Sequence, residues 1–124
     1  MTEYVGKALP RYNGLGQVNG TAVFVDDIQM SGMLYAKLLR SPVSKGTIKN
    51  IDFSAALKIP GVVGVITADD IPGQNLCGTY GDQAVLNPKD IRYKGEPIAA
   101  IVAKDEDTAA GALSEVKMDI EELT

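Results

Sequence analysis

The sequence predicts an α+β domain with a mixed or antiparallel sheet and two or three short helices, for three reasons. Short β-rich apolar runs recur along the chain, and the clearest are Val62–Ile66 and Ile98–Ala103. Only residues 105–116 carry apolar side chains at helical spacing over several turns. Glycine and proline, 13 and 6 residues, separate the apolar runs. Several short strands with few helices between them favour α+β over a regular alternation of strands and helices.

The first half of the chain is expected to contain an arm followed by short strands. Residues 1–20 are rich in Gly, Pro and Asn, which predicts an extended arm with turns rather than a helix. The remaining residues, 21–124, form the predicted domain. Its first strands are expected at Val23–Val25, at Met33–Leu39 and around Ile48–Phe53.

Residues 54–90 combine cap signals, one apolar run and a long loop. Ser54 is expected to cap a short helix over residues 55–58, because its hydroxyl can accept a free amide at a helix start. The run Val62–Ile66 has the profile of a buried strand. Thr67, with Asp70 three residues later, resembles a second cap. Residues 72–90 show the weakest pattern and are predicted to be a long loop, which in a compact domain is usually functional or docked.

The C-terminal part gives the clearest predictions. Ile98–Ala103 is expected to be a strand buried on both faces. Acidic residues open the predicted helix at 105–116, where the helix dipole favours negative charge. Its apolar face has the spacing i, i+3, i+4, i+7 and consists of Ala109, Ala112, Leu113 and Val116. Alternation from Met118 to Glu121 predicts a final half-buried strand.

Composition argues against several functions. The net charge of −4 gives no support to nucleic-acid binding. Histidine is absent, which removes the commonest general base and the commonest transition-metal ligand. The single cysteine, Cys77, cannot form an internal disulfide and is interpreted as a passive thiol in a Gly-rich loop. With no signal peptide at its start and no apolar run long enough to span a bilayer, the chain is expected to be cytoplasmic, without membrane contact.

No catalytic constellation can be recognised from the residues. Ser41 has no histidine to activate it, so a Ser-His triad is excluded. The pairs Asp26-Asp27 and Asp69-Asp70 are adjacent carboxylates, which point to opposite faces of a strand and are interpreted as turn and cap residues. The glycines around Gly14-Leu15-Gly16 do not complete a dinucleotide-binding fingerprint. Residue chemistry alone therefore predicts an α+β domain without catalytic, cofactor-binding or metal-ligating residues.

Four segments carry a resemblance that goes further. In order, they contain Gly6–Arg11 with Val18–Ala22, then Leu39–Pro42, then Pro60–Gly73, and finally Ile91–Ala103. Together, at these spacings, they resemble the molybdenum-binding large subunit of the xanthine dehydrogenase and aldehyde oxidase family. The resemblance covers about Val5 to Leu123 and implies the N-terminal α/β-hammerhead domain of that subunit. Val43-Ser44-Lys45 stands where the family often has histidine, which leaves the substrate open.

The resemblance implies the kind of enzyme to which the chain belongs, but it assigns no catalytic or cofactor-binding residue within the chain. It implies a full enzyme that hydroxylates an aldehyde or a heteroaromatic ring such as a purine, with water as the oxygen source. The implied cofactors are molybdopterin, iron–sulfur clusters and FAD, and none is expected to bind residues of this chain. The implied partners are the remaining domains of the molybdenum subunit and the iron–sulfur and flavin subunits or domains.

The irregular segments where the resemblance stays close are the candidates for contact with those missing domains. They are the loop at 72–90 and two tripeptides, Arg40, Ser41, Pro42 and Gly95, Glu96, Pro97. Arg40 could instead be a buried structural arginine, and a single arginine without a convergent site favours that interpretation over an interface contact. A stand-alone binding module that uses this fold without molybdenum chemistry is the alternative function.

Overall fold

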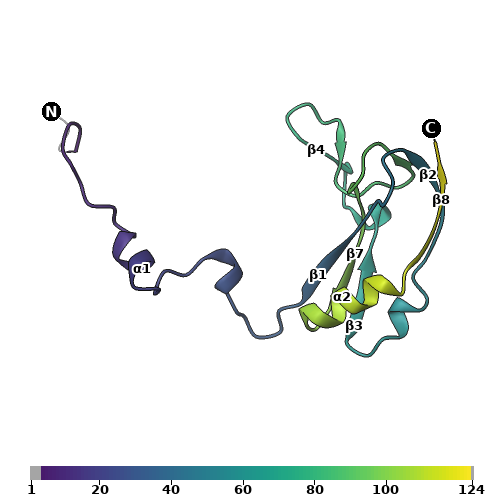
Figure 1. Cartoon of the computed structure of the whole chain (residues 1–124), viewed down its shortest axis with the longest axis horizontal. Helices are drawn as coiled ribbons and strands as arrows, with labels where there is room; N and C mark the ends of the chain where they lie inside the picture. Colours follow the sequence, from purple (N-terminus) through teal and green to yellow (C-terminus); the bar gives the residue numbers. More distant parts are fainter. Residues whose placement is uncertain (1–3, 124) are drawn as a thin grey trace. The chain divides into compact units, whose positions relative to one another are not determined.

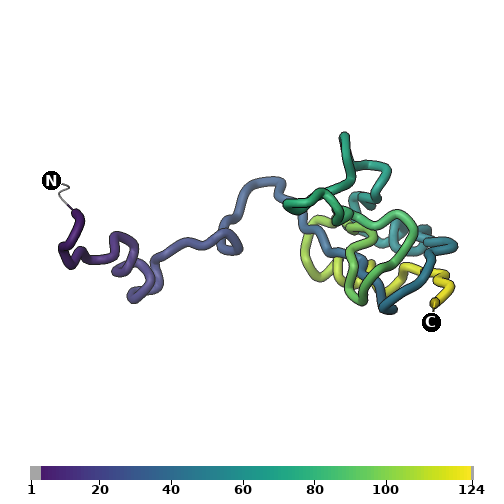
Figure 2. Tube along the Cα trace, turned by 90° about the horizontal axis from the view of Figure 1, so that it is seen from above, coloured from purple at the N-terminus to yellow at the C-terminus, as the bar shows by residue number. Residues whose placement is uncertain are grey.

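The computed structural model describes residues 4–123, which fall into two compact units. The first unit ends at Ser31 and the second begins at Gly32. Figure 2 follows the trace through both units, in purple to blue and in blue to yellow. No helix in the described part of the chain is long and apolar enough to cross a membrane.

The first unit holds two short helical turns. Helix α1 spans Gly14–Val18, where an extended arm without a helix is expected, so that prediction is wrong. The turn forms because the Gln17 and Asn19 N–H groups donate to the Asn13 and Leu15 carbonyl oxygens at 3.3 and 3.0 Å. Gly20 then ends it with a φ of 75°.

The predicted strand at Val23–Val25 is also wrong, because a 3-10 helix, η1, spans Val25–Asp27. The Asp27 carboxylate accepts a hydrogen bond from the Phe24 N–H at 2.9 Å, and the Asp27 N–H donates back to the Phe24 carbonyl at 3.0 Å. This local side-chain bond competes with extended backbone. It also confirms the interpretation of Asp26-Asp27 as a turn.

The second unit is built on two three-stranded antiparallel sheets, which confirms the α+β class (Figure 1). The first sheet has the order β1-β7-β3, with β1 at Tyr35–Arg40, β3 at Val62–Ile66 and β7 at Pro97–Ala103. The second has the order β6-β2-β8, with β2 at Gly46–Asp52, β6 at Asp90–Ile91 and β8 at Lys117–Glu122. Figures 1 and 2 show β8, in yellow, beside β2.

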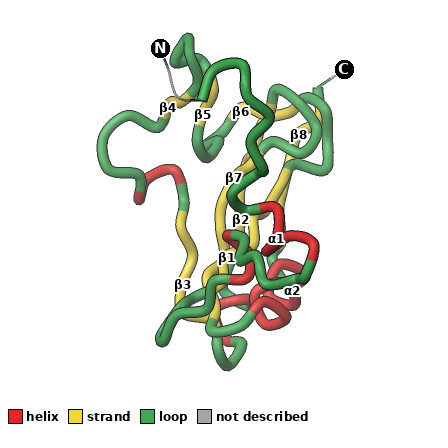
Figure 3. The backbone as a smooth tube through the Cα atoms, turned by 90° about the vertical axis from the view of Figure 1, so that its left-hand side faces the viewer, coloured by secondary structure: helices red, strands yellow, loops and turns green. Residues whose placement is uncertain are grey.

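The remaining elements of the second unit follow between these strands along the chain. Helix α2 spans Glu106–Ser114, and 3-10 helices η2 and η3 span Ala56–Lys58 and Ala68–Asp70. A two-stranded hairpin, β4 at Leu76–Cys77 and β5 at Gln83–Ala84, lies inside the predicted loop at 72–90. Figure 3 shows α2 in red beside the lower ends of the yellow strands.

Helix α2 begins as the sequence predicts. Asp105 is its N-cap, and the Asp105 carboxylate accepts hydrogen bonds from the Thr108 N–H and Oγ1–H, both at 2.8 Å. Thr67 is held in the same way, since its N–H and Oγ1–H donate to the Asp70 carboxylate at 2.7 and 2.9 Å. Ser54, however, makes no cap bond to η2, whose N-cap is Ala55. The Ser54 N–H instead donates to the Asp52 carboxylate at 2.9 Å.

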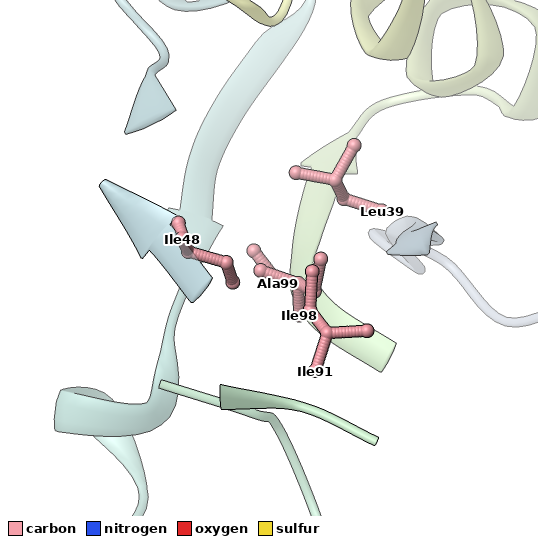
Figure 4. Packing of buried hydrophobic residues seen from close by; sticks show 5 residues of the cluster. All are labelled: Leu39, Ile48, Ile91, Ile98 and Ala99. Carbon is pink, nitrogen blue, oxygen red and sulfur yellow. The ribbon is translucent and has the colours of Figure 1, made fainter. Parts of the chain in front are cut away.

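The core joins the two sheets. One buried cluster, shown in Figure 4, takes Leu39 from β1, Ile48 from β2, Ile91 from β6, and Ile98 with Ala99 from β7. A second cluster lies under α2, where Ile101 contacts Ala56 and Ala112. All of Ile98–Ala103 except Val102 is buried, as predicted for a strand with two covered faces.

Candidate functional site

The two tripeptides chosen from the sequence contact each other where β1 ends and β7 begins. The Ser41 N–H donates to the Glu96 carbonyl, and the Gly95 N–H donates to the Ser41 carbonyl, both at 2.9 Å. Arg40 extends this ladder, because its Nη1 donates to the Gly95 carbonyl at 2.9 Å. Arg40 is exposed, so it is not a buried arginine, but it does link the two segments.

Glycine and serine set the backbone at this junction. Gly95 has a φ of 87°, in the left-handed region that costs a residue with a Cβ about 1–2 kcal/mol. The Ser41 hydroxyl donates to the Val43 carbonyl at 2.7 Å and accepts from the Val43 N–H at 3.2 Å. These bonds turn the chain away from β1 at Pro42, whose missing N–H could not continue the ladder.

Glu96 is the centre of the junction, and its side chain is 1% exposed. Its carboxylate accepts the Arg92 N–H at 2.7 Å and the Arg92 guanidinium through Nε at 3.1 Å and Nη2 at 3.0 Å. Burial acts to raise the pKa of the Glu96 carboxyl, but the bonds from Arg92 and from the Asn87 side chain outweigh it and lower the pKa. The carboxylate is therefore a buried anion whose hydrogen-bond partners are supplied by the protein. We call Glu96, Arg92 and Asn87 the Glu96 cluster.

The Glu96 cluster also anchors the loop at 72–90. The Arg92 Nη1 donates to the Asp82 carbonyl at 2.7 Å, and the Gln83 Nε2 donates to the Tyr93 hydroxyl at 3.3 Å. A shallow surface hollow is lined by these same four residues.

Two asparagines fix the base of the loop. The Asn75 side chain pairs with Leu86, donating to its carbonyl at 2.6 Å and accepting its N–H at 3.0 Å. Asn87 is buried, and its Nδ2 donates to the Asp90 carbonyl at 2.7 Å. The loop is thus an ordered hairpin, held by side-chain hydrogen bonds from Arg92, Gln83, Asn75 and Asn87.

Sequence reasoning missed Asn75, Asn87 and Arg92. A signal was available for one of them, since Arg92 and Glu96 are opposite charges four residues apart. That spacing suggests a helical pair, whereas the pair here closes a turn between β6 and β7. The asparagines gave no pattern, because their partners Leu86 and Asp90 are backbone groups.

Candidate residues for contact with another domain must be accessible. Arg40 and Pro42 are exposed and Gly95 is half-buried, whereas Ser41 and Glu96 are buried inside this unit. Ser41 and Glu96 can only shape such a surface, by holding the turns that present their neighbours. That any of these residues contacts another domain stays a prediction.

The described residues contain no cluster of metal-ligating side chains. Among residues 4–123, no three His, Cys, Asp or Glu side chains gather where they could hold an ion. The buried polar residues in this part of the chain are Ser41, Asn87 and Glu96, and each is bonded within the protein. No chemical step is therefore assigned to residues of this chain.

Comparison with known proteins gives the context. Residues 19–124 match the family model described as the aldehyde oxidase and xanthine dehydrogenase a/b hammerhead domain. The chain is 38% identical to a probable xanthine dehydrogenase subunit of Bacillus subtilis, over 91% of this chain and 15% of that protein. It is 34% identical to the xanthine dehydrogenase molybdenum-binding subunit of Escherichia coli O157:H7, over 91% of this chain and 16% of that protein.

A solved structure agrees with the sequence relatives. The aldehyde oxidoreductase from Desulfovibrio gigas superposes with a TM-score of 0.87 at 33% identity, over 93% of this chain and 14% of that one. The chain thus spans about one seventh of these three proteins. Antiparallel sheets, the superposition and a family match over most of the sequence lead to one conclusion: this chain belongs to the α/β-hammerhead domain family of aldehyde oxidases and xanthine dehydrogenases.

Proposed function

We propose that this chain serves as a structural domain of a molybdenum hydroxylase, in a polypeptide that also contains the catalytic domains. The observation that carries the proposal is the match of nearly the whole chain to a small fraction of its relatives, 15% of the Bacillus subtilis protein and 14% of the Desulfovibrio gigas enzyme. The first is named as part of a dehydrogenase and the second as an oxidoreductase, and a third relative is named as a molybdenum-binding subunit.

The proposed reaction is the hydroxylation of an aldehyde or of a heteroaromatic ring such as a purine, with water as the oxygen source. Molybdopterin, iron–sulfur clusters and FAD belong to other domains or subunits in this proposal. The residues of the present chain hold the fold and the hairpin at 72–90. Their contribution is to present a fixed surface to the domains that bind the cofactor.

The division into an arm at 1–20 and a domain at 21–124 is part of the proposal. The family model begins at residue 19, close to that boundary. Within residues 4–20, Tyr4, Leu9, Tyr12 and Leu15 are exposed large apolar side chains. Such residues are suited to packing on another domain, because tyrosine in particular can bury its ring and keep its hydroxyl in water.

The experiment is to purify the full-length polypeptide that contains this sequence, together with its co-expressed partners. We expect bound molybdenum by elemental analysis and turnover of xanthine or an aldehyde. A full-length protein without molybdenum, from a host that loads a known family member, would contradict the proposal and favour a stand-alone binding module.

A second measurement tests the non-catalytic part of the proposal. The 124-residue chain is mixed with molybdopterin and binding is followed by equilibrium dialysis. We expect no saturable binding, because the described residues present no convergent polar site. Tight binding would overturn the assignment of the cofactor to other domains.

A further inference from the structure

The two sides of the β1-β7-β3 sheet can be identified from the strand register. Residues aligned across neighbouring strands share a side of the sheet. Lys37 aligns with Ile101 and Val65, and this row lies under α2, because Ile101 and Val65 pack with Ala112 of that helix. Lys37 also forms an ion pair with Glu106 of α2. One side of the sheet is therefore the side that α2 covers.

The opposite side is made of the alternate residues. Leu38 aligns with Ala100 and Ile66, and Ala36 aligns with Val102 and Gly64. We call these two rows the outer apolar face, which consists of Ala36, Leu38, Gly64, Ile66, Ala100 and Val102. No member is polar or charged, which is unusual for one side of an antiparallel sheet that faces water.

Within residues 32–123, the two edges of the outer apolar face are open to solvent, whereas Ala100 at its centre is only 7% exposed. Leu38 is 40% exposed and Ile66 is 41% exposed. A Cβ added at Gly64 would meet no atom of the described residues within 4 Å, so the space above the β3 edge of the face is open. Beside it, Val63 in the irregular part of β3 is 55% exposed. A contiguous apolar surface of this kind in a water-soluble domain marks a contact site.

We propose that the outer apolar face is the surface on which another domain of the same polypeptide docks, through uncharged apolar side chains. This inference rests on the proposed function and adds which side of the molecule makes the contact. The relatives argue for this occupant, because about 84–86% of each lies outside the segment that this chain matches. A charged partner surface is disfavoured, because its charged side chains would lose water at the contact and find no opposite charge among these six residues.

The small residues of the face define what fits. Ala36 and Gly64 stand on either side of Val102, beside a row in which Leu38 and Ile66 stand on either side of Ala100. An apolar side chain of the partner can fit over Ala100 between Leu38 and Ile66, and others can pack over Ala36 and Gly64 beside Val102. Both rows then become buried, including Val102, the one residue of Ile98–Ala103 that is not buried within this chain.

Cysteine labelling tests the inference. Ile66→Cys and Leu38→Cys are placed singly in a Cys77→Ser background, and Ser114→Cys, at the exposed end of α2, reports access to the other side. Maleimide labelling at each site is followed by peptide mass spectrometry, in the 124-residue chain and in the full-length protein. We expect rapid labelling of both outer-face cysteines in the short chain and labelling at least about tenfold slower in the full-length protein.

Each other outcome overturns the inference. Equal rates in the two proteins would show that no other domain covers the face. Slow labelling in the short chain that speeds up on dilution would point to a second copy, and slow labelling that is relieved by removing residues 1–31 would point to the first unit. Molybdenum content of the same full-length preparation is measured separately. A molybdenum-loaded protein with reactive outer-face cysteines therefore refutes the docking surface and leaves the proposed function standing.

Discussion

The two sides of the β1-β7-β3 sheet are built from similar residues but have different surroundings. On one side, Ile101 is fully buried against Ala112 of α2. On the other, Ile66 belongs to the same sheet and has the same side chain, yet it is 41% exposed. The difference shows that the sheet has apolar residues on both sides, although α2 covers only one of them. Substitutions on the two sides should therefore lower the free energy of unfolding by very different amounts.

The largest expected effect is on the covered side. Ile101→Ala removes a fully buried side chain between the sheet and α2. We expect the free energy of unfolding to fall by about 3 kcal/mol, because the cavity cannot be filled by rigid neighbours. Urea denaturation of the 124-residue chain measures this. A loss below about 1 kcal/mol would mean that α2 does not pack tightly on this side.

The second effect concerns the Glu96 cluster, which is the polar counterpart of the Ile101 site. Glu96→Ala leaves the Arg92 N–H without its acceptor and removes the second acceptor of the Asn87 amide, which keeps its bond to the Asp90 carbonyl. We expect a loss of about 2.5 kcal/mol, less than for a fully buried ion pair because the Arg92 side chain is 48% exposed. The hairpin at 72–90 should also lose order, since Arg92 holds Asp82. Faster amide exchange at Gln83 and Ala84 would report that loss, and unchanged exchange would contradict the anchoring role.

Backbone strain gives the next effect. Gly95→Ala places a Cβ at a φ of 87°, and we expect a loss of about 1.5 kcal/mol from strain alone, because the added Cβ meets no neighbour. Gly64→Ala is the matched control, since its Cβ also meets open space but its φ is not positive. Thermal unfolding should show a clear decrease for the first substitution and little change for the second. Equal decreases would exclude strain at Gly95 as the cause.

Acid should reveal the charge of Glu96. Its pKa is lowered in the folded state, so its contribution to stability is complete above the unfolded pKa of about 4.3 and is lost as the pH falls through the folded pKa. Glu96→Gln removes the charge and keeps the shape, at a cost of about 1 kcal/mol at neutral pH. The stability difference between wild type and variant should shrink below about pH 4. Other carboxyls with lowered pKa values, such as Asp70 and Asp105, are present in both proteins and cancel. A difference that stays constant as the pH is lowered from neutral to about 3 would contradict the assignment.

Local signals explain which parts of the fold could be predicted from the sequence. The strand at 97–103 and helix α2 carry periodic apolar residues and, for α2, an aspartate cap, so pattern and structure agree. The strand predicted at Val23–Val25 failed because the Asp27 carboxylate captures a backbone amide, a bond that composition does not reveal. Val62–Ile66 was correctly predicted as a strand, but its burial was overestimated, because an apolar run does not show whether its second face is covered by this chain.

The candidate site was predictable only in part. The two tripeptides at 40–42 and 95–97 were chosen as contacts to something outside the chain, whereas the structure pairs them with each other through backbone bonds. Backbone pairing between segments so far apart in sequence has no signature in side-chain chemistry. Asn75 and Asn87, whose amides bind backbone groups of the hairpin, were missed for the same reason.

The smallest expected effect is on the outer apolar face and completes the comparison. Ile66→Ala removes the same atoms as Ile101→Ala, but from a side chain that is already 41% in water and borders open space. Because little packing is lost and no closed cavity forms, the free energy of unfolding of the isolated chain should fall by less than about 1 kcal/mol. Urea denaturation of both variants under the same conditions gives the ratio of their losses in free energy of unfolding. If Ile66→Ala costs as much as Ile101→Ala, the outer face is already packed within this chain, and the docking surface proposed for it has no room for another domain.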